Sequence, residues 1–386
     1  MIREFGMKNF FCFKEGSSVS FAFDNNVPTE ISKGKDVGNV IGIKGANGSG
    51  KTNIIKALAF ISDFIVKSAD KDIDEDIEVD SFGDNEDPSE FYVEFYSSGT
   101  NYLYELEVKK SGVVSEVLWR KNKRKSLVFS RKGNIIEKNI DETKEIKKLK
   151  LKSNASVISL HNKFNFNSEM EDFKKVYGFF SKIFTNVSYS GLSQGLFEAL
   201  SFEYISERYA KVGKVFDFVK DVIISSDTGV KDIKILERLD EKGEKLYLPV
   251  FIHENEGKEF PLTIYDESSG TQQLYKVLYL YWVSIEYGGI LAMDEFDIHL
   301  HSLILPKILN LFNDENLNSE GAQFIFTSHN TEIIDSLGKY RTVLVNKENN
   351  ESYCYRLDEL PGGLIRNDRP ISPLYMKGKI GGVPKL

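Results

Sequence analysis

The chain has 386 residues, of which 41% are hydrophobic and 28% charged, so its composition excludes a wholly disordered protein and its length suits about two to three domains. No run of 18 apolar residues is present, which excludes a membrane-spanning helix, and the N-terminus lacks the apolar core of a secretory signal, so we expect a cytoplasmic protein. The net charge of −8 gives no overall basic signature for nucleic acid, and the distant Cys12 and Cys354 predict two reduced thiols rather than a disulfide.

The first elements in chain order are a hairpin, a buried strand and a helix. Short apolar runs flank a Lys-Glu-Gly turn within residues 1–23, which predicts two antiparallel strands. Residues 40–43 form an apolar run that ends in a glycine-rich turn. Apolar residues then recur at helical spacing over 52–66, which predicts an amphipathic helix.

Charge is distributed unevenly over the next part of the chain. Eleven carboxylates and one lysine lie between residues 70 and 90, and such a block is typical of an exposed linker or loop. Fifteen lysines and arginines lie between 109 and 152, most densely at 120–125. A basic turn between strands explains this cluster, and a contact with nucleic acid or an acidic protein partner is the alternative, because phosphate neutralisation needs clustered cations.

The remaining elements follow from periodicity. A β-meander is predicted over 91–96, 102–108, 113–119 and 126–130, followed by mostly helical segments at 141–152 and 168–225 and by strands at 230–236, 246–252 and 260–265. The last third alternates predicted helices (270–287, 300–313, 331–337) with predicted strands (290–293, 323–327, 342–346). This alternation predicts a parallel sheet covered by helices.

The strongest motif is GANGSGKT at 45–52, which fits GxxxxGK[ST] between a predicted buried strand and a predicted helix. Its glycines let consecutive backbone N–H groups face phosphates, and the helix N-terminus adds its positive dipole end. Lys51 would reach the β- and γ-phosphates, and the Thr52 hydroxyl would bind Mg²⁺. We therefore predict a site for ATP and Mg²⁺ formed by Gly45, Asn47, Gly48, Ser49, Gly50, Lys51, Thr52 and Asn53.

Two later strands end in polar residues. Residues 289–295 form an apolar strand followed by Asp294, which would hold Mg²⁺, and Glu295, which would take the proton from the attacking water or orient it. Residues 323–330 form a strand with a polar end that contains His329. Because the carboxyl ends of parallel strands meet at the ligand crevice, His329 would reach the γ-phosphate.

The other histidines carry less information. His299 and His301 suggest a zinc site with Asp297, but residues two apart on a helix do not share a face, so we expect none. His161 and His253 have no recognisable partners in the sequence.

These motifs resemble, in content and order, those of the ABC-type ATPase heads of SMC, RecF and OLD proteins. The resemblance rests on the opening strand at 1–15 and on GANGSGKTN (45–53), LAMDE (291–295), DIHLH (297–301) and TSHN (327–330). It implies an α/β P-loop ABC-type ATPase head with a mostly parallel sheet, an antiparallel β-lobe and a helical and β insertion. The implied parts are an N-terminal ATPase half (1–66), an acidic linker (67–90), a β-lobe extension (91–140), a helical arm (141–259) and a C-terminal ATPase half (260–386).

Residues 267–273, ESSGTQQ, stand where the resemblance places the ABC signature, and they are similar to the S-x-G-T form of this branch. A Ser–Gly turn at a helix N-terminus is also an anion cup. The resemblance implies that Ser268, Ser269 and Gly270 cap the nucleotide of the opposite subunit, so the active unit is a homodimer or a higher homo-oligomer. No glutamine is assigned to the usual metal-contacting loop of the family.

The chain also resembles stand-alone ATPases of prokaryotic anti-phage loci, namely RloA-like proteins and the ATPase components of PARIS and Septu systems, whose ending LYLxGxYGxxP is similar to residues 372–384. This implies a sensor or scaffold of an abortive-infection system that controls a separate effector, a nuclease or toxin from the same operon. A RecF-like or SMC-like DNA-repair ATPase and a non-enzymatic nucleotide-gated binding module are the alternatives. The pair Asp294–Glu295 argues against the last of these.

Overall fold

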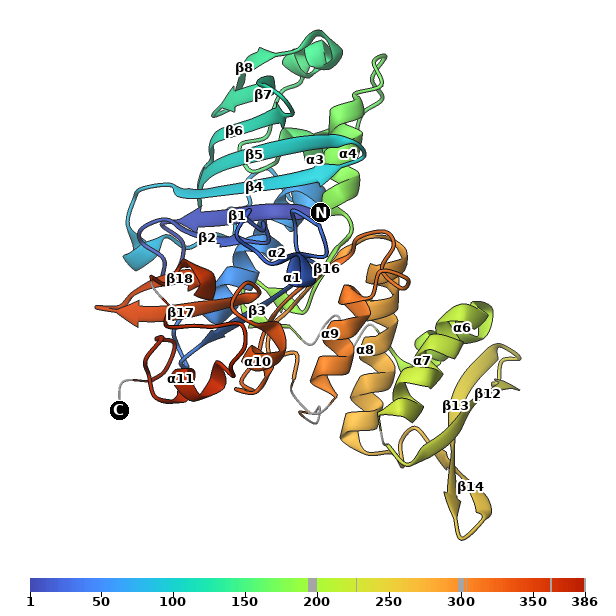
Figure 1. Cartoon of the computed structure of the whole chain (residues 1–386). Coiled ribbons are helices and arrows are strands. Elements are labelled where there is room, and N and C mark those ends of the chain that lie inside the picture. The colour runs from blue at the N-terminus through green and yellow to red at the C-terminus, as the bar shows by residue number, and fades with distance from the viewer. Residues whose placement is uncertain (194–199, 227, 298–301, 303, 362, 385–386) are drawn as a thin grey trace.

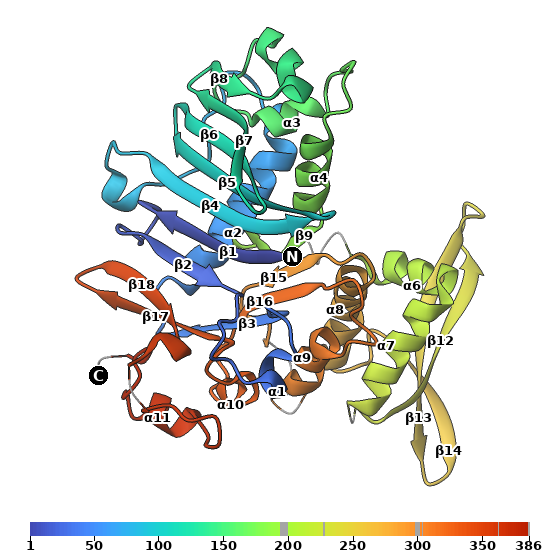
Figure 2. The ribbon, with the colours of Figure 1, turned by 45° about the horizontal axis from the view of Figure 1, so that its top comes forward.

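The computed structural model describes residues 1–193, 200–226, 228–297, 302, 304–361 and 363–384. A large antiparallel sheet and a mostly parallel sheet enclose helix α2 (Lys51–Lys67), while a three-stranded sheet projects from one side of the molecule (Figure 1 and Figure 2). The described residues contain no helix long and apolar enough to span a bilayer.

The antiparallel sheet combines the predicted hairpin with the predicted meander. Its strand order is β2-β1-β4-β5-β6-β7-β8. Burial alternates along β4, so that Phe91, Val93 and Phe95 face the core while Glu90 and Glu94 lie on the outer face, as period-2 side-chain geometry requires. The strands are β1 (Ile2–Lys8), β2 (Ser17–Ser20), β4 (Ser89–Ser97), β5 (Thr100–Lys109), β6 (Gly112–Lys121), β7 (Lys125–Lys132) and the unpredicted β8 (Ile135–Asn139).

The second sheet is the predicted parallel one, in the order β18-β17-β3-β16-β15-β9. All its neighbouring strands are parallel except the β17–β18 pair. Two of its strands were not predicted: β9, three residues long within a segment expected to be helical, and β18. The strands are β3 (Val40–Gly45), β9 (Ile183–Thr185), β15 (Ile290–Met293), β16 (Gln323–Thr327), β17 (Thr342–Glu348) and β18 (Glu351–Arg356).

The helices agree with the predicted pattern in most of the chain. The predicted helix at 141–152 is instead a 3₁₀ segment, Asp141–Lys148, and part of the predicted helix at 300–313 lies outside the described residues. The described α-helices besides α2 are α1 (Thr29–Ser32), α3 (Val157–His161), α4 (Glu171–Phe180), α6 (Phe202–Lys211), α7 (Gly213–Ser225), α8 (Ser269–Glu286), α9 (Leu305–Asn313), α10 (Ile333–Leu337) and α11 (Ser372–Met376).

The projecting sheet packs beside the helices α6, α7 and α8. Its strands are β12 (Val230–Leu239), β13 (Lys245–Asn255) and β14 (Lys258–Thr263), close to the predicted positions. A short hairpin of β10 (Val187–Ser188) and β11 (Gly191–Leu192) follows β9 and lies against α2. The segment after β9 therefore leads the chain from the parallel sheet back to the central helix.

The acidic segment is a loop with many exposed carboxylates, as expected, but it is anchored to the core. Ile77 and Val79 are buried in the main core, and the Ile77 amide donates to the Lys110 carbonyl. Asp80 accepts a hydrogen bond from Tyr189 and forms an ion pair with Lys110 at 3.0 Å. Two apolar residues, spaced two apart within the charged run, thus anchor this segment to the main core.

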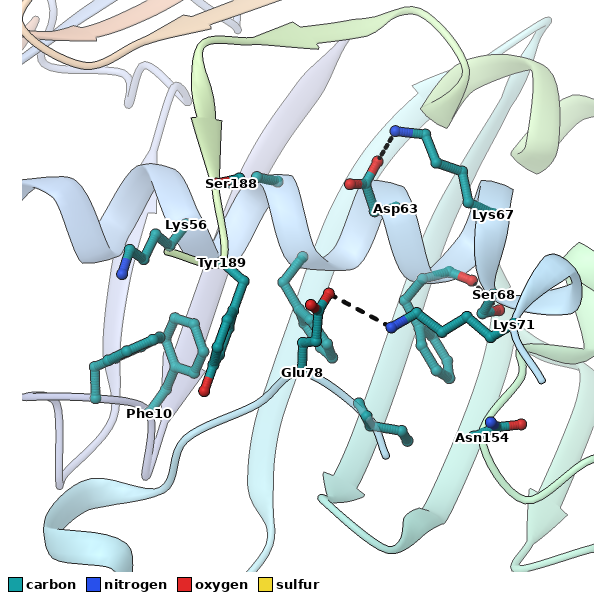
Figure 3. A pocket seen from close by; sticks show the side chains of 15 residues that line it. Phe10, Lys56, Asp63, Lys67, Ser68, Lys71, Glu78, Asn154, Ser188 and Tyr189 are labelled. Atoms are coloured by element: carbon teal, nitrogen blue, oxygen red, sulfur yellow. Dashed lines mark hydrogen bonds and ion pairs between the residues drawn. The ribbon is translucent and has the colours of Figure 1, made fainter. Parts of the chain in front are cut away.

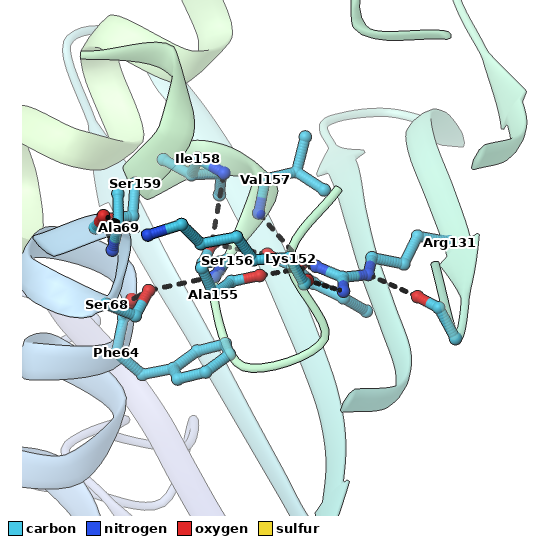
Figure 4. A network of polar contacts seen from close by, with 12 residues as sticks. Phe64, Ser68, Ala69, Arg131, Lys152, Ala155, Ser156, Val157, Ile158 and Ser159 are labelled. Atoms are coloured by element: carbon cyan, nitrogen blue, oxygen red, sulfur yellow. Dashed lines mark hydrogen bonds and ion pairs between the residues drawn. The ribbon is translucent and has the colours of Figure 1, made fainter. Parts of the chain in front are cut away.

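A buried ion pair connects the antiparallel sheet to the segment that follows it (Figure 4). Arg131 of β7 and Glu116 of β6 lie 3.3 Å apart, and both side chains are fully buried. The Arg131 guanidinium also donates to the carbonyls of Lys152 and Ala155, and Ser156 donates to Glu116. Because buried charges need such complete pairing, the network fixes residues 152–156 against the sheet.

Candidate nucleotide-binding site

The loop between β3 and α2 has the backbone conformation that its glycines permit. Gly48 and Gly50 have φ values of 73° and 108°, which disfavour residues with a Cβ. A Cβ on Gly50 would also lie 2.6 Å from the Cys12 sulfur. The Ser352 hydroxyl donates to the Ser49 carbonyl at 2.7 Å and so supports the loop from β18. Asn47 and Gly48 are exposed at its tip.

Lys51 begins α2 and folds back over this loop. Its ammonium donates to the carbonyls of Gly45 at 3.0 Å and Ala46 at 3.1 Å. Burial lowers the pKa of Lys51, and the carboxylates of Asp294 and Glu295 act in the opposite direction. The Lys51 ammonium therefore lies inside the loop and within the field of both predicted acidic residues.

Asp294 is held by residues from three other elements. It accepts from the Thr52 hydroxyl at 2.8 Å and from the Thr327 hydroxyl at 2.5 Å, and it is only 4% exposed. The Asn186 side chain, at the end of β9, both accepts from the Asp294 amide and donates to the Asp294 carbonyl. Oxygen ligands suit Mg²⁺, so the adjacent oxygens of Thr52 and Asp294 fit this ion.

Asn186 is a residue that the sequence did not identify. It is 3% exposed and lies beside Asp294 because β9 runs parallel to β15. β9 has only three residues and no periodic signal, so nothing local in the sequence marks Asn186, the residue that follows it, as part of the site.

Glu295 and His329 lie together at the carboxyl ends of β15 and β16. His329 Nε2 is 3.2 Å from Glu295 Oε1, and both side chains are partly exposed. Glu295 has a φ of 49°, which is unusual for a residue with a Cβ, and its amide donates to the Thr327 hydroxyl. Strained backbone of this kind is concentrated at functional sites.

Among the described residues, neighbours of His329 bind Asp297. It accepts from the Ser328 hydroxyl and from the Asn330 amide. His299 and His301 lie outside the described residues. Over the described part of the chain, no group of three or more metal-ligating side chains is found. His161 stacks on Phe166 with ring centroids 5.8 Å apart.

One hollow lies at the phosphate loop, and a second lies along α2. One, of about 510 Å³, is lined by the loop residues 44–49, by His329 and by the chain end at 382–384, so the predicted family-like ending lies beside the loop. The other, of about 270 Å³, runs along α2 between aromatic side chains such as Phe10 and Tyr189 (Figure 3). None of the predicted site residues lines this second groove.

The predicted signature turn forms a helix N-terminus. Ser268 is the N-cap of α8, and its hydroxyl accepts from the Thr271 amide at 3.2 Å. Its neighbour Glu267 contacts His253, for which the sequence had shown no partner. No hydrogen bond among the described residues joins Ser268, Ser269 or Gly270 to the phosphate loop.

The basic cluster 120–125 is the predicted turn between strands, but most of its charge is used within the chain. Arg120 pairs with Asp172 at 2.6 Å, and Lys121 pairs with Glu94. The Lys125 ammonium lies 4.2 Å from the centroid of the Trp119 ring. The cluster is therefore the predicted turn between strands, and three of its cations also contact residues of the same chain.

Comparison with protein-family models places the chain in a family. The model described as "AAA domain, putative AbiEii toxin, Type IV TA system" matches residues 40–335, and the chain belongs to this family. Comparison with curated proteins gives no match.

Two solved structures are similar to the chain. The SMC head domain from Thermotoga maritima is 15% identical, with a TM-score of 0.47 over 92% of this chain and 98% of that one. The Smc head domain from Pyrococcus furiosus, with an extended coiled coil and bound to the C-terminal domain of ScpA, is 14% identical, with a TM-score of 0.44 over 93% and 97%.

Proposed function

We propose that this protein binds and hydrolyses ATP with Mg²⁺ at the site formed by the phosphate loop and the ends of β15 and β16. The observation that carries the proposal is the convergence of Thr52, Asp294 and Thr327 within hydrogen-bond distance, beside the contact between Glu295 and His329. Residues from three separate segments thus supply the groups that phosphoryl transfer to water needs.

Each group has a distinct role. The loop amides and Lys51 would hold the β- and γ-phosphates, while Thr52 and Asp294 would hold Mg²⁺. The bound ion would neutralise phosphate charge and polarise the γ-phosphoryl group. Glu295 accepts the proton of the attacking water or orients that water, and His329 positions Glu295 and contacts the γ-phosphate.

Binding at the loop is tested with a fluorescent ATP analogue and the variants Lys51→Ala and Lys67→Ala. Lys51→Ala should abolish binding, because the loop loses the cation that contacts the phosphates. Lys67 ends the same helix and pairs with Asp63 at the surface, so Lys67→Ala should bind like the wild type. Equal binding by both variants would refute the assignment.

We propose further that two copies form the complete site, with Ser268, Ser269 and Gly270 of one copy capping the nucleotide of the other. The N-terminus of α8 supports this proposal, since its free amides and dipole suit an anion. Mixing Lys51→Ala with Gly270→Asp subunits should restore hydrolysis at one of the two composite sites. If the mixture stays as inactive as either variant alone, the signature does not act in trans.

The biological role that we propose is a sensor or scaffold of an anti-phage defence system that holds and releases a separate nuclease or toxin. The family description, which names a toxin of a toxin–antitoxin system, supports this role. The alternative role is a DNA-repair ATPase, in which the cations of the cluster 120–125 would contact phosphates, although three of them also contact residues of the same chain. Co-purification with the product of the neighbouring gene, with and without ATP, tests the role: capture that is independent of nucleotide contradicts it.

A further inference from the structure

A buried carboxylate lies directly before the proposed signature turn. The Glu267 side chain is 4% exposed, and its Oε1 lies 2.6 Å from Nε2 of His253, whose side chain is 15% exposed. His253 belongs to β13 of the projecting sheet, and its ring stacks on Phe260 of β14 with centroids 5.7 Å apart. Gln272, in the first turn of α8, donates to the Glu267 carbonyl. The projecting sheet therefore holds the residue that precedes α8.

The position of Glu267 creates an electrostatic conflict with the proposed function. The N-terminus of α8 presents unpaired amides and a positive dipole end, which favour a phosphate group. A carboxylate one residue before the N-cap is able to accept hydrogen bonds from those amides itself. If it remained ionised and unpaired, it would also repel the phosphates of a nucleotide on a facing subunit.

We propose that His253 is a positioning residue that holds the Glu267 carboxylate, so that the signature turn stays available to the nucleotide of the partner copy. This inference rests on the proposed function. In the structure, the contact with His253 directs the carboxylate toward β13, and Ser268 alone takes the N-cap position. The projecting sheet thus keeps the adjacent carboxylate away from the phosphate-binding end of α8.

The test compares His253→Ala with the double variant His253→Ala/Glu267→Gln. His253→Ala should keep its affinity for ATP at the phosphate loop, but its turnover should fall about tenfold or more, because the Glu267 carboxylate is then free to turn toward the phosphates. Adding Glu267→Gln should restore most of that turnover, since it removes the charge. His161→Ala, in the helical segment after the large sheet, is the matched control and should behave as the wild type.

A purely structural role predicts the opposite result for the double variant. Glu267→Gln would then leave His253→Ala unchanged or weaken it further, and either outcome would overturn the proposal, as would wild-type turnover by His253→Ala itself.

A subunit-mixing experiment separates this inference from the function on which it rests. His253→Ala subunits mixed with Lys51→Ala subunits should regain hydrolysis, as Gly270→Asp subunits do. If the Gly270→Asp mixture is active and the His253→Ala mixture is not, the inference fails while the trans arrangement stands. If neither mixture is active, the trans arrangement itself fails.

Discussion

Asn186→Ala should impair both the stability of the fold and its response to Mg²⁺. The wild-type side chain makes two buried hydrogen bonds to the main chain of Asp294, of 2.9 and 2.8 Å. Its removal leaves an amide and a carbonyl without these partners, each at a cost of about 1 to 3 kcal/mol, so we expect a loss of about 2 to 4 kcal/mol after water partly replaces the side chain. Urea unfolding at fixed pH measures this loss.

The same substitution should weaken nucleotide binding only when Mg²⁺ is present. The phosphate loop makes no hydrogen bond to Asn186, whereas Asp294 loses its anchor and holds the ion less well. Asn39→Ala is the matched control. Asn39 is a buried residue at the opposite end of the same sheet that donates to the Ala322 carbonyl, so its loss should destabilise the fold without changing the Mg²⁺ dependence. If both variants respond to Mg²⁺ alike, or if Asn186→Ala unfolds like the wild type, Asn186 does not position Asp294.

Two further perturbations test the buried charges. Arg131→Met should lower the free energy of unfolding by about 3 to 5 kcal/mol, because it leaves the buried Glu116 without its cation. Adding Glu116→Gln in the same chain should recover part of that loss in a double-mutant cycle measured by urea unfolding. Additive losses would contradict the pairing. Burial lowers the pKa of Lys44 from 10.5 to about 8, so the unfolded chain binds more protons and stability should rise from about pH 8 to pH 10.5. In Lys44→Met, up to about 3 kcal/mol of this rise in the free energy of unfolding should be absent, and the variant should be more stable than the wild type at pH 7. Parallel curves of stability against pH for the two proteins would refute the argument.

The elements that the sequence predicted well are those whose signal is local. The run at 290–293 is apolar throughout and the run at 323–327 has three consecutive apolar residues at its centre, as strands buried on both faces require, and the structure gives both strands the predicted limits. The loop motif likewise combines a glycine pattern with a preceding strand and a following helix. Each of these features lies within a few consecutive residues.

The missed features depend on contacts between distant segments. Asn186 acquires its place only when β9 pairs with β15, more than a hundred residues later in the chain. Ile77 and Val79 lie within an acidic run whose average charge conceals them. Composition alone does not show that Arg120 of the basic cluster has carboxylate partners at Glu142 and Asp172.

The mass of the Glu295→Gln protein in solution, with and without ATP and Mg²⁺, tests the central claim most directly. Asp294 and Thr52 remain to hold the ion, while the attacking water loses its base, so ATP should convert this variant into a stable dimer that does not turn over. The wild-type protein should form the same dimer transiently and lose it as ATP is consumed. Undiminished hydrolysis by Glu295→Gln, or a mass that ATP leaves unchanged, would contradict an ATPase that closes around its nucleotide.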